Sequence, residues 1–156
     1  MHARLFSAVI LFSALSAPVY SLPVELKDQP AMAIADPSSL ADPKLEEGLA
    51  ALKKGDNASA EKAFRKAIEL DPKISGGYIG MAEVSGRTNK PKDVERWLQE
   101  GVKKIPDNSL LAMTYGRWLA TQGRTNEADA LLTKAAKLAP DSVEPYLALC
   151  EIHLST

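Results

Sequence analysis

Small and apolar residues recur along most of this chain with the spacing of a helix. Three stripes share one pattern, in which a large apolar residue follows a small or β-branched residue by four positions and precedes a small residue by three. The stripes are Ala60–Phe64–Ala67, Val94–Leu98–Gly101 and Ala128–Leu132–Ala135. Positions three and four apart lie on one face of a helix, so each stripe predicts a helix that buries this face.

The stripes recur at a constant interval, since their large residues Phe64, Leu98 and Leu132 are evenly spaced along the chain. Each stripe is followed by a proline, which ends the helix because it lacks the backbone N–H and clashes with the preceding turn; these are Pro72, Pro106 and Pro140. A column of mostly small residues has the same period: Gly48, Ala82, Gly116 and Cys150. A period of about 20 to 50 residues indicates a solenoid whose units stack to bury a continuous core.

The pattern therefore predicts an all-α fold, a solenoid of three full helix pairs and one extra helix. Residues that tolerate a left-handed backbone separate the two helices of each pair, and they are Gly55, Asn89 and Gly123. The expected helices cover residues 43–54, 58–70, 74–86, 91–104, 108–122, 126–138 and 143–154.

Polar residues at the expected helix starts are candidate N-caps, because their side chains can accept from the first free backbone N–H groups. These candidates are Asp42, Asp56 or Asn57, Asn108 and Thr125. Proline is favoured at the first helical position, so Pro43 and Pro91 support the starts of their helices.

This arrangement resembles the tetratricopeptide repeat, a helix–turn–helix unit of about 34 residues, which is also the interval between the prolines. The repeats are expected at 41–74, 75–108 and 109–142, with a partial fourth at 143–156, inside a repeat domain of residues 42–156. Repeat one departs from the family pattern, since Lys44, Glu47 and Ala51 stand where the family usually has large apolar or aromatic residues. The resemblance implies that the helix pairs stack into a right-handed superhelix, and it implies partner binding rather than catalysis.

The first residues are typical of a cleavable secretory signal. Arg4 precedes an uncharged apolar run from Leu5 to Ala17, and small residues follow at Val19 and Ser21. We predict a signal peptide at 1–21; a cut after Ala17 would place Pro18 next to the scissile bond, and a buried N-terminal helix is the alternative. The run is shorter than the roughly 20 residues that a membrane span needs, so we expect a periplasmic or secreted protein with no membrane span after cleavage.

Residues 22–41 carry Pro23, Pro30 and Pro37 and have no helical periodicity. They predict an extended linker. Its apolar patch, Ala31 to Ala35, is alternatively a segment that lies along the first repeat.

Charge and composition exclude several kinds of function. The net charge of −1 gives no overall attraction to nucleic acid or anionic lipid, and acidic residues separate the basic pairs. The one cysteine excludes an internal disulfide and a multi-cysteine metal site. We expect Trp97 and Trp118 to pack in or beside the core rather than to stack on bases or sugars. Gly76, Gly77, Gly80 and Gly86 spell no phosphate-binding motif.

Catalysis would depend on Cys150 and His153, three positions apart on the last helix. Cys150 belongs to the small-residue column, and His153 to the column of Ala51, Ser85 and Leu119, so we interpret both as helix-packing positions. The chain is therefore predicted not to be an enzyme and to hold neither cofactor nor metal.

In the family that this chain resembles, the first helix of each pair lines a concave groove. The matching positions are Leu45, Leu49, Ile79, Glu83, Met113, Arg117, Leu147 and Glu151. One turn further lie Leu52, Gly86, Ala120 and Leu154. A mostly apolar floor with few charges suits a helix or an extended apolar segment of another protein.

Members of the family that bind chaperone tails hold a C-terminal carboxylate between lysine, asparagine and arginine side chains. The matching positions here are Leu45, Leu49, Gly80, Leu110 and Thr114. None of them can pair with a carboxylate, so short acidic C-terminal peptides are not expected ligands.

The expected last helix is apolar on more than one side, with Val143, Tyr146, Leu147, Leu149, Ile152 and Leu154. Either the chain is part of a longer array, which we favour, or this surface meets a partner or a second copy. Together with the predicted signal peptide, the resemblance implies an exported scaffold that mediates protein–protein interactions in the assembly of an envelope complex. The alternative is a ligand-binding or regulatory subunit of a periplasmic enzyme complex, which would need an enclosed pocket.

Overall fold

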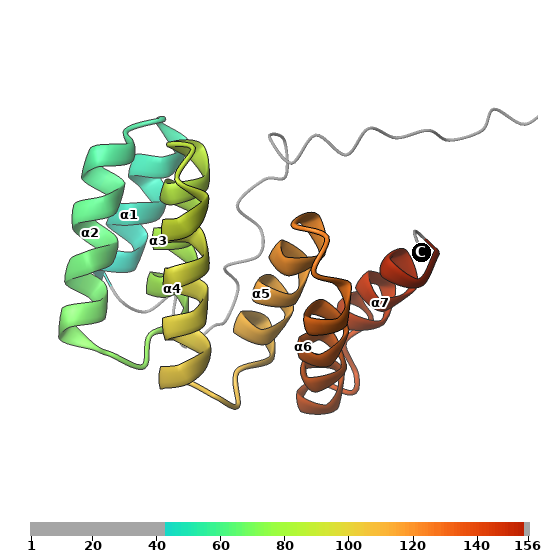
Figure 1. Ribbon diagram of the computed structural model, residues 1–156. Helices are drawn as coiled ribbons and strands as arrows, with labels where there is room; N and C mark the ends of the chain where they lie inside the picture. The colour runs from blue at the N-terminus through green and yellow to red at the C-terminus, as the bar shows by residue number, and fades with distance from the viewer. Residues whose placement is uncertain (1–42, 155–156) are drawn as a thin grey trace, which may run out of the picture.

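A computed structural model describes residues 43–154, which form seven helices and no strand (Figure 1). The helices are α1 Pro43–Lys53, α2 Asn57–Leu70, α3 Ser75–Arg87, α4 Pro91–Lys104, α5 Ser109–Thr121, α6 Thr125–Leu138 and α7 Glu144–Leu154. The predicted all-α fold is confirmed, and every helix begins and ends within one residue of its predicted bounds. The expected signal peptide and linker lie outside the described residues.

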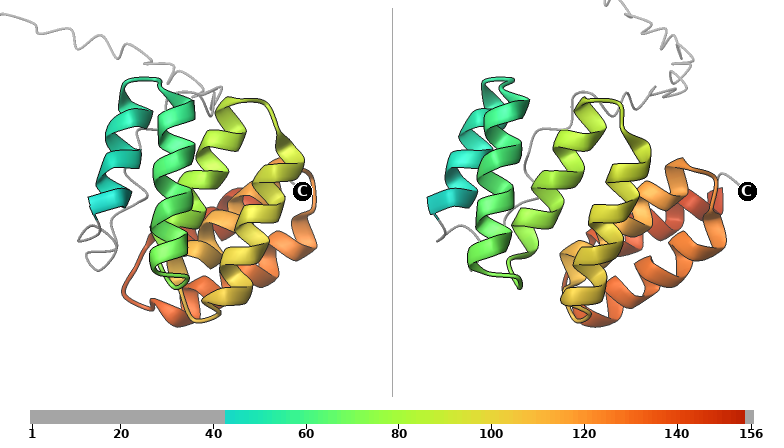
Figure 2. Two further views of the ribbon diagram at one scale, coloured as in Figure 1. Left: turned by 90° about the vertical axis from the view of Figure 1, so that its left-hand side faces the viewer. Right: turned by 60° about the vertical axis from the view of Figure 1, so that its left-hand side comes forward.

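Each helix packs against the next one along the chain, and the pairs stack into a superhelix. The odd-numbered helices also contact one another in the order α1, α3, α5, α7, whereas α2, α4 and α6 come no closer than 8 Å between Cα atoms. The odd-numbered helices therefore line the inner, tighter face. Figure 2 shows how the later helices turn progressively away from the direction of α1 and α2.

The turns inside the three pairs have the backbone that the sequence predicts. Gly55 and Gly123 have φ angles of 76° and 73°, and Asn89 has φ 55°. A positive φ is costly for most side chains, and glycine and asparagine tolerate it best. These three residues reverse the chain between the first and second helix of each pair.

Two of the predicted N-caps are present and one is wrong. The side chains of Asp56 and Asn108 accept from the backbone N–H groups of Ser59 at 3.0 Å and Leu111 at 2.9 Å. Thr125, however, is the first residue of α6, whose N-cap is Arg124. Pro91 opens α4 as predicted, and Asp42 lies outside the described residues.

The core interlocks small residues with large ones, as the stripes predict. Phe64, Leu98 and Leu132 are buried, as are the small residues of their stripes. A β-carbon on Gly116 would lie 2.8 Å from Leu132 Cγ, which is too close for a real contact. The two helices of a pair thus touch where one of them has no side chain.

The buried side chains form two clusters. The first joins α1, α2 and α3 and includes Leu111 of α5. The second joins α4, α5, α6 and α7 and includes Ala82 of α3. Trp97 and Val102, both on α4, pack against both clusters. The two clusters therefore meet along α4. Among the described residues, no helix combines the length and hydrophobicity that crossing a membrane requires.

Candidate interaction surface on the odd-numbered helices

The eight predicted groove residues all belong to the odd-numbered helices, but two of them are buried. Leu45 is 0% exposed and Ile79 is 5% exposed, and both belong to the first core cluster. Leu52, one turn further, is also buried there. The prediction that Leu45 and Ile79 line the groove is therefore corrected, because a buried side chain cannot contact a partner unless the core opens. The first cluster extends to the inner side of α1 and α3, which the residue spacing alone does not reveal.

The apolar surface of the inner face comes from three helices. Leu49 on α1 is half-buried and packs against the first cluster, and Met113 on α5 is half-buried and packs against the second. Leu147 on α7 is 57% exposed. An apolar side chain that is only partly covered can bury further surface against a partner, which is the main source of binding free energy at such faces.

The charged groove residues differ in what they contact. Arg87 Nε donates to Glu83 Oε1 at 2.8 Å, and Arg87 Nη1 donates to the carbonyl oxygen of Leu52 at 2.9 Å. Glu83 therefore helps to hold the end of α3 against the end of α1. Arg117 and Glu151 are exposed on α5 and α7. Arg87 was missed by the sequence reasoning, because no other repeat has an arginine in its column.

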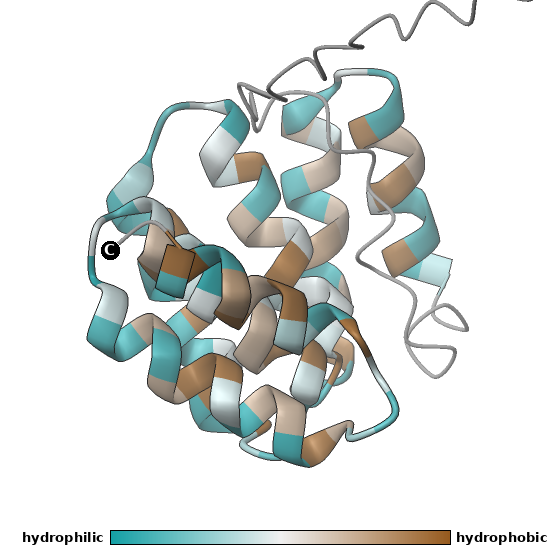
Figure 3. Cartoon of the chain, turned by 90° about the vertical axis from the view of Figure 1, so that its right-hand side faces the viewer, coloured by the Kyte–Doolittle hydropathy of each residue, from teal (hydrophilic) through white to brown (hydrophobic). Residues whose placement is uncertain are grey.

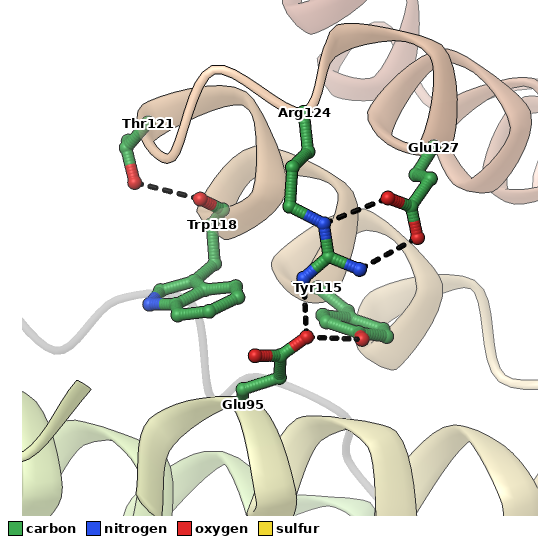
Figure 4. Close-up of polar contacts among 6 residues, drawn as sticks. All are labelled: Glu95, Tyr115, Trp118, Thr121, Arg124 and Glu127. Atoms are coloured by element: carbon green, nitrogen blue, oxygen red, sulfur yellow. Dashed lines mark hydrogen bonds and ion pairs between the residues drawn. The ribbon is translucent and has the colours of Figure 1, made fainter. Parts of the chain in front are cut away.

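A polar network joins the second and third pairs (Figure 4). Glu95 Oε1 on α4 accepts from the hydroxyl of Tyr115 at 3.4 Å and from Arg124 Nη1. Arg124 also donates from Nε and Nη2 to the carboxylate of Glu127, at 2.7 and 2.6 Å. One arginine at the start of α6 thus binds carboxylates of two repeats.

The network shifts the pKa values of its members in directions that follow from these contacts. The hydrogen bond from Arg124 lowers the pKa of Glu127, and the bonds to Glu127 and Glu95 raise the pKa of Arg124. Burial raises the pKa of Tyr115, and the neighbouring Glu95 carboxylate adds to this effect. At neutral pH the arginine and the Glu127 carboxylate are therefore charged and the Tyr115 phenol is neutral.

Both tryptophans are half-buried, which agrees with the packing role predicted for them. The guanidinium groups of Arg65 and Arg96 lie 5.3 and 5.0 Å from the centre of the Trp97 ring. Trp97 also lines a hollow of about 210 Å³ between α2 and α4, on the outer side of the stack. The centres of the Trp118 and Tyr115 rings lie 6.2 Å apart, beside the Glu95 network (Figure 4).

The last helix differs from what its columns predict. Cys150 is exposed, although Gly48, Ala82 and Gly116 of its column are buried. His153 is exposed too, and its Nε2 lies 3.1 Å from Asp129 Oδ1. The packing role predicted for both residues is wrong for the described part of the chain, because no helix of that part covers this side of α7. The described residues contain no cluster of three or more histidine, cysteine, aspartate or glutamate side chains that could hold a metal.

Residues 41–74 match the model of the tetratricopeptide repeat family. This segment has the same bounds as the predicted first repeat, although its first helix departs most from the family pattern. The match covers one of the three full repeats.

Two relatives match longer stretches of the chain. The human protein O-mannosyl-transferase TMTC2 is 32% identical over 89 residues, which are 55% of this chain and 11% of that protein. The type IV pilus assembly protein PilF of Pseudomonas aeruginosa is 27% identical over 96 residues, which are 62% of this chain and 38% of that protein. The chain thus spans only about a tenth to two fifths of the length of these relatives.

Solved structures share the fold. The structure of Pseudomonas aeruginosa PilF has a TM-score of 0.65 and 25% identity, over 77% of this chain and 54% of that one. The first tetratricopeptide-repeat domain of RPAP3 bound to the HSP90 peptide SRMEEVD has a TM-score of 0.63 and 18% identity, over 80% of this chain and 97% of that one. The fold is therefore the all-α superhelix of tetratricopeptide-repeat domains.

Proposed function

We propose that this chain is a protein-interaction scaffold that binds an apolar segment of a partner along the inner face of its odd-numbered helices. The observation that supports this most is that two neighbouring helices of that face, α5 and α7, each carry a partly exposed apolar side chain. Met113 on α5 and Leu147 on α7 lie on helices that contact one another, and both positions match the groove of the repeat family. Similar domains bind peptides, as the RPAP3 structure does with its HSP90 peptide.

The chemistry of the face specifies the kind of segment. Arg117 and Glu151, one turn after Met113 and Leu147, place one charge of each sign beside the apolar residues. A partner segment that is apolar at its centre, with a carboxylate near Arg117 and a cation near Glu151, would match this order. Such rim charges select the register and orientation of a partner more than they add affinity.

We further propose that the scaffold is exported and serves the assembly of a complex in a bacterial envelope. The apolar run before Ser21 supports export. Similarity to a type IV pilus assembly protein and to a cellulose synthase operon protein supports an envelope role. Mass spectrometry of the protein recovered outside the cytoplasm is expected to give a chain that begins at Leu22. A recovered chain that still begins at Met1 would contradict the export proposal.

The groove proposal is tested by affinity capture from an envelope extract. We expect the double variant Met113→Glu and Leu147→Glu to lose the partner that the wild-type chain captures, because two carboxylates would interrupt the apolar face. The matched control is Leu70→Glu with Leu138→Glu, since these leucines are exposed at the ends of α2 and α6, outside the inner face. Capture that survives the groove variant, or that both variants abolish equally, would contradict the groove proposal.

A further inference from the structure

Arg117 on the inner face is the one arginine within residues 43–154 that has no ion pair with another described residue. It is exposed on α5, one turn after the half-buried Met113. A guanidinium beside an apolar side chain suits a ligand that combines a carboxylate with an apolar group. The other arginines are already bound to carboxylates: Arg65 to Glu61, Arg87 to Glu83, Arg96 to Asp93, and Arg124 to Glu95 and Glu127.

The apolar surface next to Arg117 continues from α5 onto α7. Leu147 on α7 is 57% exposed, and α5 and α7 contact one another. Figure 3 views the molecule from the side of α7, where apolar and polar positions alternate along the helices. The axes of packed helices lie about 8–10 Å apart. A ligand that runs along the stack from α7 toward α1 would therefore meet Leu147, then Met113, then Arg117.

The chain contains a segment with matching groups in this order. Residues 22–41 lie outside the described residues and precede α1. The stretch between Asp28 and Asp36 is uncharged, and its large apolar residues are Met32 and Ile34. Alternate residues of an extended chain point to the same side, about 7 Å apart. Met32, Ile34 and Asp36 would therefore lie in a row on one side of an extended segment.

We propose that residues 28–36 bind the inner face of their own chain and cover it until a partner displaces them. The carboxylate then meets the unpaired arginine, and the two large apolar side chains bury the exposed apolar surface of α5 and α7. This inference rests on the proposed function, because it uses the same site, and it adds regulation from within the chain. The contacts are Asp36 with Arg117, Ile34 with Met113, and Met32 with Leu147.

The link between the segment and α1 is long enough for these contacts. Asp36 stands seven positions before Pro43, the first residue of α1, so an extended link reaches about 23–25 Å. On the inner face only α3 lies between α1 and α5, which corresponds to about 16–20 Å. Arg117 is eight positions after Ser109, the first residue of α5, or about 12 Å along that helix. The two distances combine to about 20–23 Å.

The direction of the link also fits, because the chain would pass from α7 over α5 and then enter α1. A segment joined to its site by a short link has an effective concentration of about 1 mM. A contact with a dissociation constant of about 0.1 mM would then be formed in about nine tenths of the molecules. The same contact between two copies would need a protein concentration near that constant, so the segment of the same chain is favoured.

The test compares two forms of the processed chain that begins at Leu22. The opened variant carries Met32→Glu and Ile34→Glu, which disable the attached segment. A fluorescently labelled peptide of residues 24–40 is expected to bind the opened variant saturably in anisotropy, with a dissociation constant below about 0.1 mM. It should bind the wild type at least about tenfold more weakly, because the attached segment competes. Ser38→Glu with Ser39→Glu is the matched control, with equal added charge and affinity expected to stay as weak as in the wild type.

Further changes in the opened variant locate the peptide. Leu147→Glu is expected to weaken peptide binding at least about tenfold, whereas Leu138→Glu, at the exposed end of α6, changes it less than about twofold. A peptide with Asp36→Lys should bind about two- to fivefold more weakly, since an exposed ion pair contributes modestly. Arg117→Glu in the protein should restore the affinity of that peptide, because the two charges are then exchanged.

Four outcomes would overturn the proposal. One is the absence of saturation of the opened variant by about 1 mM peptide. The second is equal affinity for the wild type and the opened variant, which would mean that the attached segment leaves the face uncovered. The third is binding that Leu147→Glu leaves intact, which would place the peptide on another surface. The fourth is a wild-type dimer in sedimentation that Met32→Glu with Ile34→Glu dissociates, which would assign the segment to a second copy.

Capture from an envelope extract distinguishes this inference from the proposed function. If both hold, the opened variant captures more of the partner than the wild type does. Peptide binding as expected, with no partner captured by either form, would contradict the scaffold function and leave the contact of residues 28–36 in place. Capture that Met113→Glu with Leu147→Glu abolishes, but that is equal for the wild type and the opened variant, would support the scaffold function and contradict the covering of its inner face.

Discussion

Gly48 faces Phe64 so closely that a β-carbon on the glycine would lie 2.5 Å from Cε1 of the ring. The other side of the same ring is equally tight, since a β-carbon on Gly80 would lie 2.6 Å from it. Phe64 on α2 is thus held between α1 and α3, and this one ring joins the first pair to the second.

We expect Gly48→Ala to lower the free energy of unfolding by about 1–3 kcal/mol, because the added methyl group must displace the buried Phe64 ring. The measurement is urea denaturation followed by circular dichroism. The matched control is Gly86→Ala on α3, where a β-carbon would meet no atom within 4 Å. There alanine is expected to raise stability by up to about 1 kcal/mol through its better helix propensity. If Gly48→Ala stabilises as much as the control does, the close contact with Phe64 is wrong.

A second prediction concerns the start of α5, where Asn108 accepts from Leu111 N–H at 2.9 Å. Asn108→Ala removes this acceptor and is expected to cost about 1 kcal/mol of unfolding free energy, again in urea denaturation. Thr125→Ala is the matched control, because Thr125 stands at the start of α6 without acting as its cap. Its effect is expected to stay within about 0.5 kcal/mol. A larger loss for Thr125→Ala than for Asn108→Ala would restore the cap that the sequence suggests.

The helices could be predicted from the sequence because the signals for them repeat. The stripe around Phe64 returns around Leu98 and Leu132, and the turn at Gly55 returns at Asn89 and Gly123. Each signal is local and is confirmed twice within the chain, so the bounds of the helices follow closely. The prediction of Thr125 as the N-cap of α6 is wrong because it used residue preference alone. The residue at the cap position is Arg124, which donates to Glu95 of another repeat.

The interaction surface could be predicted only in part. Column spacing places Leu45 and Ile79 on the correct helices, but it gives no measure of how far the core extends around them. Cys150 is exposed although its column is buried elsewhere, because burial at that position depends on a neighbouring helix and not on Cys150 itself. The contacts of Arg87 and Glu95 occur once each, so no period reveals them.

A third prediction follows from the contact between Arg124 and Glu127. The arginine holds the pKa of the Glu127 carboxyl below its ordinary value of 4.5, so the folded state favours the ionised form. The stability from this pair is therefore present above the ordinary pKa and is lost as the pH falls through the lower pKa of the folded protein. Between about pH 5 and pH 3 the urea midpoint should fall further in the wild type than in Glu127→Gln.

Glu127→Gln isolates this group, because the carboxyls of Asp56 and Glu144, whose pKa values are also lowered, titrate in both proteins. The difference between the two pH profiles is expected to be small, since an exposed ion pair is screened by solvent. A wild-type profile that runs parallel to that of Glu127→Gln would contradict a folded-state contact with Arg124.

The last prediction separates this inner face from that of domains which bind chaperone tails. RPAP3 shares the fold and binds the acidic peptide SRMEEVD. In this chain the positions that would hold the peptide carboxylate are Leu45, Leu49, Gly80, Leu110 and Thr114, and Leu45 and Gly80 are buried. A carboxylate needs positive charge or several N–H donors to leave water, and these side chains supply no positive charge. We expect no saturable heat of binding for SRMEEVD in titration calorimetry.

The double variant Leu49→Lys and Thr114→Lys introduces two cations at half-buried positions of the same face and is expected to gain measurable affinity. Micromolar binding by the wild-type chain would mean that cations elsewhere hold the peptide and that the assignment of the inner face is wrong.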